Sequence, residues 1–131
     1  LADWRGLDFI EGIQNEPMKK LVQNLTFKKA VINLATPSSI QFPHTHGTST
    51  VITYYINPDW KKEYYGETIF YDDSMTHCIG TSLYHTNSAV IFDGKIPHSI
   101  RPASHIAPSY RFSLSVFFRQ KNFIEEAKNS S

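Results

Sequence analysis

The sequence has a single cysteine, Cys78, among its 131 residues, and this excludes a disulfide bond within the chain. A lone thiol is typical of a reducing compartment, so we expect an intracellular, cytoplasmic protein. No apolar run approaches the roughly 20 residues of a membrane-spanning helix, and we find no charged and then apolar leader. Blocks of like charge are also missing, and a formal net charge of +1 indicates neither a nucleic-acid-binding nor a membrane-binding surface.

Aromatic residues, in contrast, are abundant: the chain has nine Phe, seven Tyr and two Trp, and 40% of it is hydrophobic. This composition predicts a folded protein with a core rather than a disordered chain. A length of 131 residues is enough for one domain and too short for two, so we expect residues 1–131 to form a single domain. Because the first residue is Leu1 and not Met, we also expect the natural protein to extend further upstream.

The hydrophobic pattern changes from helical to extended near residue 28. Before that point apolar residues recur at roughly helical spacing in two groups, Leu7, Phe9, Ile10 and Ile13, then Met18, Leu21 and Leu25. Pro17 either separates two short helices or opens the second. After that point we expect six short strands, at 29–35, 49–57, 67–73, 88–94, 98–102 and 110–119. This order predicts a β-sandwich or barrel with helices packed on one outer face.

Side chains in the last expected strand alternate between two different faces. One face is apolar and the other is mixed, with Phe112, Leu114, Val116 and Phe118 on the first, and Arg111, Ser113, Ser115 and Phe117 on the second. A face exposed to solvent would usually carry more charge than this second set. One cation with two small hydroxyls and an aromatic ring indicates the lining of a cavity. The same parity places Thr53 and Tyr55 on one face of strand 49–57.

Three histidines and one arginine have the spacing of a metal site that binds an organic acid. His44 and His46 are one residue apart, so on an extended backbone both side chains leave the same face and can reach one metal ion. His98 follows an apolar strand and a turn, where a barrel returns it to the first pair. Arg111 begins the strand with the mixed face and supplies a cation for an anion.

The blocks around these residues resemble a known enzyme family. In chain order, HTH, YYINPDW, GETIF, VIFDGKIPHSIRP and YRFSLSVFF resemble the iron(II)/2-oxoglutarate dioxygenases, and among them the prolyl-4-hydroxylase-like branch. The resemblance covers residues 29–119 and implies a double-stranded β-helix (jelly roll). It also implies a hydroxylase that uses O2 and 2-oxoglutarate and releases succinate and CO2. The substrate is open between a prolyl or other peptide target, a nucleotide and a small metabolite.

The resemblance also implies roles for individual residues. By position, His44 and His98 match the family's iron-binding histidines, and Arg111 matches the arginine that pairs with the distal carboxylate of 2-oxoglutarate. Tyr55 matches a tyrosine that hydrogen-bonds the same carboxylate, and Ser115 matches a hydroxyl residue beside it. We therefore expect a site made of Fe(II), 2-oxoglutarate and these five residues.

One position departs from the family pattern. The family has H-x-D where this chain has H-T-H, so His46 stands at the carboxylate position, and we expect it to be the third metal ligand. The exchange removes one negative charge and should weaken O2 activation at iron. An alternative is that another carboxylate ligates the metal, with Asp72, Asp73 and Asp93 as candidates.

Two other functions stay open at this point. One is a non-catalytic metal-binding or ligand-binding jelly roll that kept the fold without the carboxylate. The other is a three-histidine dioxygenase that does not use 2-oxoglutarate. Arg111 favours an oxo-acid cosubstrate over this last alternative, because an enzyme without such a cosubstrate has little use for a buried cation.

Overall fold

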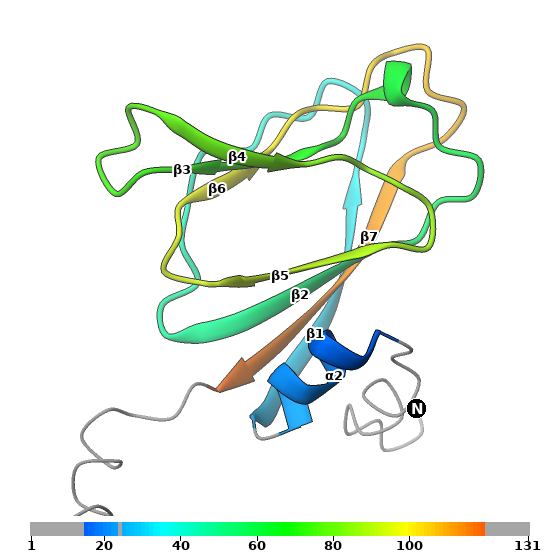
Figure 1. The fold of residues 1–131 in the computed structure, drawn as a ribbon. Coiled ribbons are helices and arrows are strands. Elements are labelled where there is room, and N and C mark those ends of the chain that lie inside the picture. The colour runs from blue at the N-terminus through cyan, green and yellow to red at the C-terminus, as the bar shows by residue number, and fades with distance from the viewer. Residues whose placement is uncertain (1–14, 24, 120–131) are drawn as a thin grey trace, which may run out of the picture.

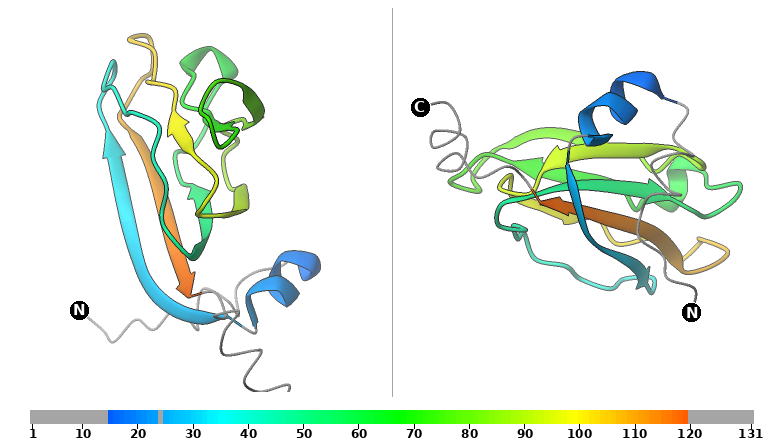
Figure 2. Two further views of the ribbon diagram at one scale, coloured as in Figure 1. Left: turned by 90° about the vertical axis from the view of Figure 1, so that its left-hand side faces the viewer. Right: turned by 90° about the horizontal axis from the view of Figure 1, so that it is seen from below.

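The computed structural model describes residues 15–23 and 25–119, and its strands form two antiparallel sheets. The elements in chain order are α2 (Glu16–Gln23), β1 (Thr26–Ala35), β2 (Ser49–Tyr55), the 3-10 helix η1 (Lys62–Tyr64), β3 (Thr68–Tyr71), β4 (Cys78–Ser82), β5 (Ala89–Asp93), β6 (His98–Ile100) and β7 (Arg111–Arg119). The four-stranded sheet has the order β1-β7-β2-β5 and the three-stranded sheet the order β4-β3-β6. The two sheets face each other as layers (Figure 1; Figure 2, left). The protein is therefore mainly β with a jelly-roll-like arrangement, as predicted.

Helix α2 packs on the outer face of the four-stranded sheet, away from the other sheet (Figure 1). Its Val22 is completely buried in one cluster with three residues of β2 and β7, namely Ile52, Val116 and Phe118. The Asn15 side chain caps the helix by accepting a hydrogen bond from the backbone N–H of Met18 at 3.0 Å. Pro17 lies in the first turn, where its missing N–H has no helical partner to lose. Pro17 therefore opens this helix, whereas the expected helical residues 7–13 lie outside the described part of the chain.

The inner face of the four-stranded sheet carries polar side chains. The register places Ser113 of β7 between Asn33 of β1 and Tyr55 of β2. All four residues of the mixed face of β7 are buried, namely Arg111, Ser113, Ser115 and Phe117. The Tyr55 hydroxyl reaches the opposite sheet, where it lies 3.0 Å from Thr68 Oγ1. The alternation along the last strand therefore places its polar set between the two sheets.

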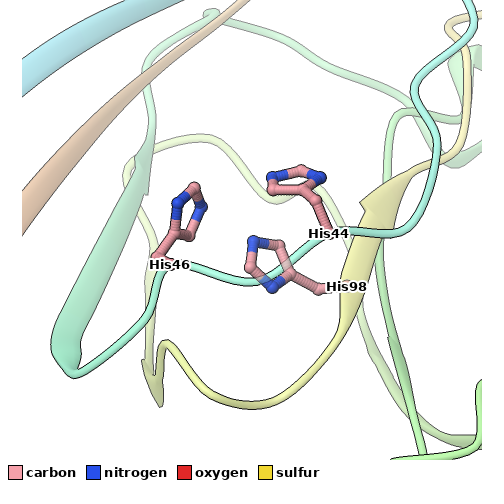
Figure 3. A group of neighbouring side chains, drawn as sticks. All are labelled: His44, His46 and His98. Carbon is pink, nitrogen blue, oxygen red and sulfur yellow. The ribbon is translucent and has the colours of Figure 1, made fainter.

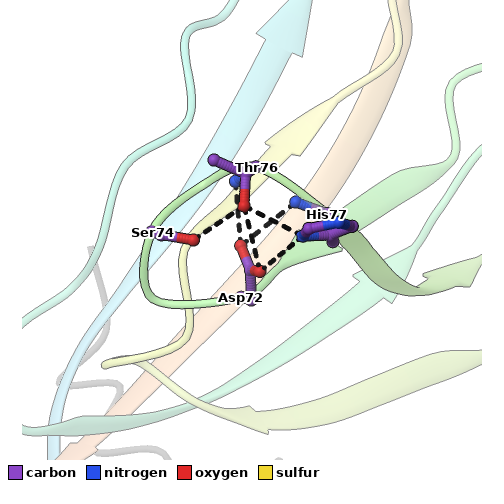
Figure 4. Close-up of polar contacts among 4 residues, drawn as sticks. All are labelled: Asp72, Ser74, Thr76 and His77. Carbon is purple, nitrogen blue, oxygen red and sulfur yellow. Dashed lines mark hydrogen bonds and ion pairs between the residues drawn. The ribbon is translucent and has the colours of Figure 1, made fainter.

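The strand β4 was not among the expected strands. Its five residues are mostly exposed and pair with β3 alone, so they carry little hydrophobic signal. The turn before it is built by Asp72, whose carboxylate accepts hydrogen bonds from the backbone N–H groups of Thr76 and His77 at 2.9 and 3.1 Å (Figure 4). Both bonds lower the pKa of Asp72, which is about 2, and the bond from His77 has the larger effect. The carboxylate therefore closes the β3–β4 hairpin.

Within residues 15–23 and 25–119, no helix has the length and apolar character needed to cross a membrane.

Candidate metal centre

Three histidine rings converge between the two sheets. His44, His46 and His98 each offer a ring nitrogen, and these three atoms lie within 4.8 Å of one another. The ring centroids are 4.5 to 4.9 Å apart, and Figure 3 shows the rings turned toward one common point. Among the described residues this is the single cluster of three or more potential ligand side chains. The structure therefore brings together the three histidines that the sequence predicted.

Backbone hydrogen bonds fix where the histidines lie. His44 and His98 exchange both backbone N–H···O=C bonds at 3.0 Å, so the segment before β2 pairs with β6 at this one position. The backbone N–H of His46 donates to the carbonyl of Gly94 at 2.7 Å, and the N–H of Gly94 donates to Ser49 at 2.7 Å. Residues far apart in the sequence are thus held together by main-chain bonds that do not depend on a metal.

The ring nitrogens are oriented for ligation. Nδ1 of His44 lies 3.0 Å from the Phe42 carbonyl oxygen, and Nδ1 of His98 lies 2.8 Å from the Ile96 carbonyl oxygen. A carbonyl can only accept, so Nδ1 carries the proton in each ring and Nε2 keeps its lone pair free for a metal. This is the outer support that metal-binding histidines typically have.

Burial keeps two of the imidazoles neutral. The pKa of His46 is lowered from 6.5 to about 4. Burial has the largest effect on it, and the neighbouring His98 has the next largest. Burial also lowers the pKa of His98. Aromatic rings supply the apolar surroundings, because Phe117 lies edge-on to His46 at 5.0 Å and Phe92 edge-on to His98 at 4.7 Å. Neutral imidazole is the form that binds a metal ion, so the site is prepared for one.

No carboxylate of the described residues joins the three histidines. Asp72 is bonded within its hairpin turn, and Asp93 accepts a hydrogen bond from the backbone N–H of Lys95 at 2.9 Å. Asp73 is exposed and is not part of the cluster. The arrangement thus supports His46 as the third ligand rather than a substitute carboxylate.

Arg111 is completely buried at the start of β7. Its Nε donates to the carbonyl of Gly66 at 2.8 Å and its Nη1 to the hydroxyl of Ser113 at 3.3 Å. Its Nη2 is the one buried side-chain nitrogen or oxygen of the described residues without a hydrogen-bond partner. Burial lowers the pKa of this guanidinium, and an unpaired buried cation is costly. Such a group indicates a site for an anion.

The two other predicted cofactor contacts lie on the same inner face. The ring of Tyr55 lies 5.6 Å from the guanidinium carbon of Arg111, and its hydroxyl contacts Ser82 Oγ at 2.9 Å. The Ser115 hydroxyl accepts a hydrogen bond from Nδ2 of Asn33 at 3.1 Å and lies 3.4 Å from Thr53 Oγ1. Their contact with 2-oxoglutarate stays a prediction.

Sequence reasoning missed the residues that anchor Arg111. The Asn57 side chain accepts the backbone N–H of Phe112 at 2.6 Å and donates to the Tyr110 carbonyl at 2.8 Å, so it holds the chain on both sides of Arg111. Tyr84 completes this anchor, because its hydroxyl lies 2.6 Å from Oδ1 of the same asparagine. The only signal in the sequence was Asn57 as the last residue of the expected strand 49–57, next to a stretch that suits a turn.

The Gly94→Ala variant should bind metal more weakly. A Cβ at this position would lie 2.6 Å from the Ser49 carbonyl oxygen and 3.0 Å from Cβ of His46, so the backbone that carries His46 must shift. We expect the affinity for Co(II), measured by calorimetry, to fall by about tenfold or more. Gly80→Ala is the matched control, since nothing lies within 4 Å of its Cβ. Equal affinities in the two variants would contradict this role of Gly94.

The metal-free protein should lose stability as the pH falls below about 6.5. The pKa of His46 is about 4 in the folded chain against an ordinary 6.5, so the unfolded chain binds more protons between these values. The free energy of unfolding therefore rises with pH across this window. On acidification the same contribution to stability disappears. Urea unfolding at pH 7.5, 6 and 5 measures it, and His46→Gln should show a smaller loss.

Comparisons with known proteins show the fold and no family. No protein-family model matches the sequence, and no curated protein sequence matches it. A prolyl-4-hydroxylase structure from Pseudomonas putida matches with a TM-score of 0.56 and 20% identity, over 73% of this chain and 54% of that chain. The chain therefore shares a fold with that structure and spans about half its length.

A second structure matches less well. The hydroxypropylphosphonic acid epoxidase from S. wedmorenis, in complex with fosfomycin, has a TM-score of 0.43 and 16% identity, over 75% of this chain and 45% of that chain. At this TM-score the likeness adds nothing to the fold assignment.

Proposed function

We propose that the chain is the core of an Fe(II)- and 2-oxoglutarate-dependent oxygenase that hydroxylates a substrate. One observation carries the proposal: the buried guanidinium of Arg111, with Nη2 unpaired, lies between the same two sheets as the three-histidine cluster. The donor set fits Fe(II), because imidazole nitrogens bind iron among other first-row metals. The unpaired guanidinium fits the distal carboxylate of 2-oxoglutarate, since an arginine fork pairs with a carboxylate through parallel N–H···O bonds.

The strand order supports a double-stranded β-helix as the finer description of the fold. The bridge between His44 and His98 adds the segment before β2 to the edge of the three-stranded sheet, next to β6. With this segment included, the sheets have the orders β1-β7-β2-β5 and His44 segment-β6-β3-β4. The chain then alternates between sheets as a jelly roll requires, and the three histidines lie where the alternation brings strand ends together.

Each residue has a separate part in the proposed site. His44, His46 and His98 would hold the metal ion, and the carbonyls of Phe42 and Ile96 keep two of their rings in the required tautomer. Arg111 would bind the distal carboxylate of the cosubstrate and so fix the end that does not react. Phe117 and Phe92 exclude water from the side of the rings that they cover.

The bound metal and 2-oxoglutarate would supply the O2 activation that oxidises the cosubstrate to succinate and CO2 and hydroxylates the substrate. The protein's contribution is orientation, charge and the exclusion of water. Because His46 replaces a carboxylate, the site keeps one more positive charge than an H-x-D site and should hold an anionic cosubstrate more tightly. The peptide or small-molecule nature of the substrate stays a prediction, as does an intracellular location.

A second candidate is a three-histidine dioxygenase that uses no 2-oxoglutarate. The absence of a carboxylate from the cluster in the described residues favours it, and the buried Arg111 with its unpaired nitrogen speaks against it.

An anaerobic titration with Fe(II) and 2-oxoglutarate separates these candidates. A chelated complex should give a metal-to-ligand charge-transfer absorption that saturates at one 2-oxoglutarate per chain. Iron binding without this absorption would favour the second candidate, and no iron binding would contradict both. Succinate formation after O2 is admitted then tests whether the site turns over.

A further inference from the structure

The exposed side chain of Lys29 supplies a second cation at the edge of the space between the sheets. A bulge in β1 between Phe27 and Lys29 sets the register so that Lys29 pairs with Phe117 of β7. The Lys29 ammonium lies over the Phe117 ring, 5.0 Å from its centroid, and the same ring lies edge-on to His46 at 5.0 Å. The ammonium group therefore contacts the same aromatic ring as His46 of the candidate metal centre.

Lys29 has no negative partner in the described part of the chain. The ion pairs of these residues join His77 to Asp72 and Arg101 to Glu67, and no carboxylate belongs to the histidine cluster. A lysine beside a site for a divalent cation repels that cation, since like charges at close range are unfavourable. The arrangement becomes favourable when an anion lies between them.

Lys29 and Arg111 are too far apart to serve the same anion. The guanidinium extends along β7 to Ser113, whereas Lys29 lies over Phe117, four residues further along the strand. At about 3.3 Å per residue, Ser113 and Phe117, which the two cations contact, lie roughly 13 Å apart along the strand, and His46 lies at the Phe117 end. A cosubstrate bound to Arg111 would therefore leave Lys29 free for a different molecule.

We propose that Lys29 determines substrate class: it binds an anionic group, a carboxylate or a tetrahedral oxoanion, on the molecule that reacts at the metal centre. The proposal rests on the proposed function for the reaction but not for the anion site itself. It predicts an acidic small molecule or an acidic peptide side chain near the reacting carbon, and it disfavours a neutral substrate.

The test uses the Zn(II)-loaded, 15N-labelled protein with saturating 2-oxoglutarate, because Zn(II) holds the histidines without turnover. The probes are sulfate with its neutral shape analogue dimethyl sulfone, and acetate with its neutral analogue acetamide, at constant ionic strength. Amide signals of Lys29, His46 and Phe117 should respond to the anions and not to the neutral probes. Comparing the responses to sulfate and to acetate shows whether the site prefers a tetrahedral oxoanion or a carboxylate.

Lys29→Met removes the charge and keeps an unbranched chain over Phe117, so it tests charge rather than packing. We expect it to raise the dissociation constant of the preferred anion by about tenfold and Lys29→Arg to keep most of the affinity. Lys28→Met is the matched control, because Lys28 lies in the bulge and Lys29, not Lys28, pairs with Phe117 in the register and has its ammonium over that ring. Its affinity should stay within about twofold of the wild type.

Equal losses in the Lys28 and Lys29 variants, responses centred on Arg111, or equal responses to charged and neutral probes would each overturn the proposal. An intact Lys29-dependent response in a protein that fails to bind 2-oxoglutarate would support the anion site and count against the proposed function. The two failures are therefore distinguishable.

Discussion

Replacing His98 with alanine should abolish stoichiometric metal binding. His98 is buried, its Nδ1 is fixed by the Ile96 carbonyl, and its ring lies 4.5 and 4.7 Å from the rings of His44 and His46. A metal left with two imidazoles loses a whole ligand, so the effect should exceed the 10- to 100-fold loss typical of an outer partner. Anaerobic titration with Fe(II), followed by removal of free metal and iron analysis, measures the occupancy.

Two further variants make this result specific. His44→Ala should lose metal to a similar extent, although its ring is less buried than that of His98. His105→Ala is the control, since His105 is exposed and outside the cluster. The far-ultraviolet circular dichroism of all three should match the wild type. Full iron occupancy in His98→Ala would contradict the assignment of His98 as a metal ligand.

The candidate site could be predicted from the sequence because its signals are local or fixed by strand parity. Two histidines one residue apart share a face wherever the backbone is extended. The alternation of Arg111, Ser113 and Ser115 with apolar neighbours indicated which face of β7 lies between the sheets, and all three are buried. The pairing of His44 with His98 depends on the whole fold, and only the order of motifs along the chain suggested it.

Other features depend on tertiary contacts that no sequence pattern shows. Strand β4 exists because the Asp72 turn folds it back onto β3. The bulge before Lys29 decides which lysine faces Phe117, and two adjacent lysines in a sequence are indistinguishable. Asn57 holds the backbone around Arg111 from a position 55 residues before Phe112. Such contacts follow from the packed structure rather than from periodicity.

Arg111→Met should raise the dissociation constant for 2-oxoglutarate by about ten- to a hundredfold. The guanidinium is buried with one nitrogen unpaired, and a charge-assisted bond in such surroundings contributes roughly 1.5–3 kcal/mol. Each 1.4 kcal/mol is about a factor of ten in affinity. Lysine should restore only part of the loss, because it keeps the charge without the planar fork. Calorimetry with Mn(II) in place of Fe(II) measures the binding without turnover.

Further measurements test whether Arg111→Met acts on cosubstrate binding and not on metal binding or folding. Mn(II) affinity without cosubstrate should barely change, because Arg111 is not part of the histidine cluster. Arg101→Met should leave the affinity for 2-oxoglutarate unchanged, since Arg101 is partly exposed and pairs with Glu67 at 2.9 Å. Saturating 2-oxoglutarate should raise the Tm of the Mn(II)-loaded wild type and much less that of Arg111→Met, because a ligand stabilises only the state that binds it. If Arg111 served packing alone, the variant would lose stability while keeping its affinity for 2-oxoglutarate, and that outcome would remove Arg111 from the proposed cosubstrate site.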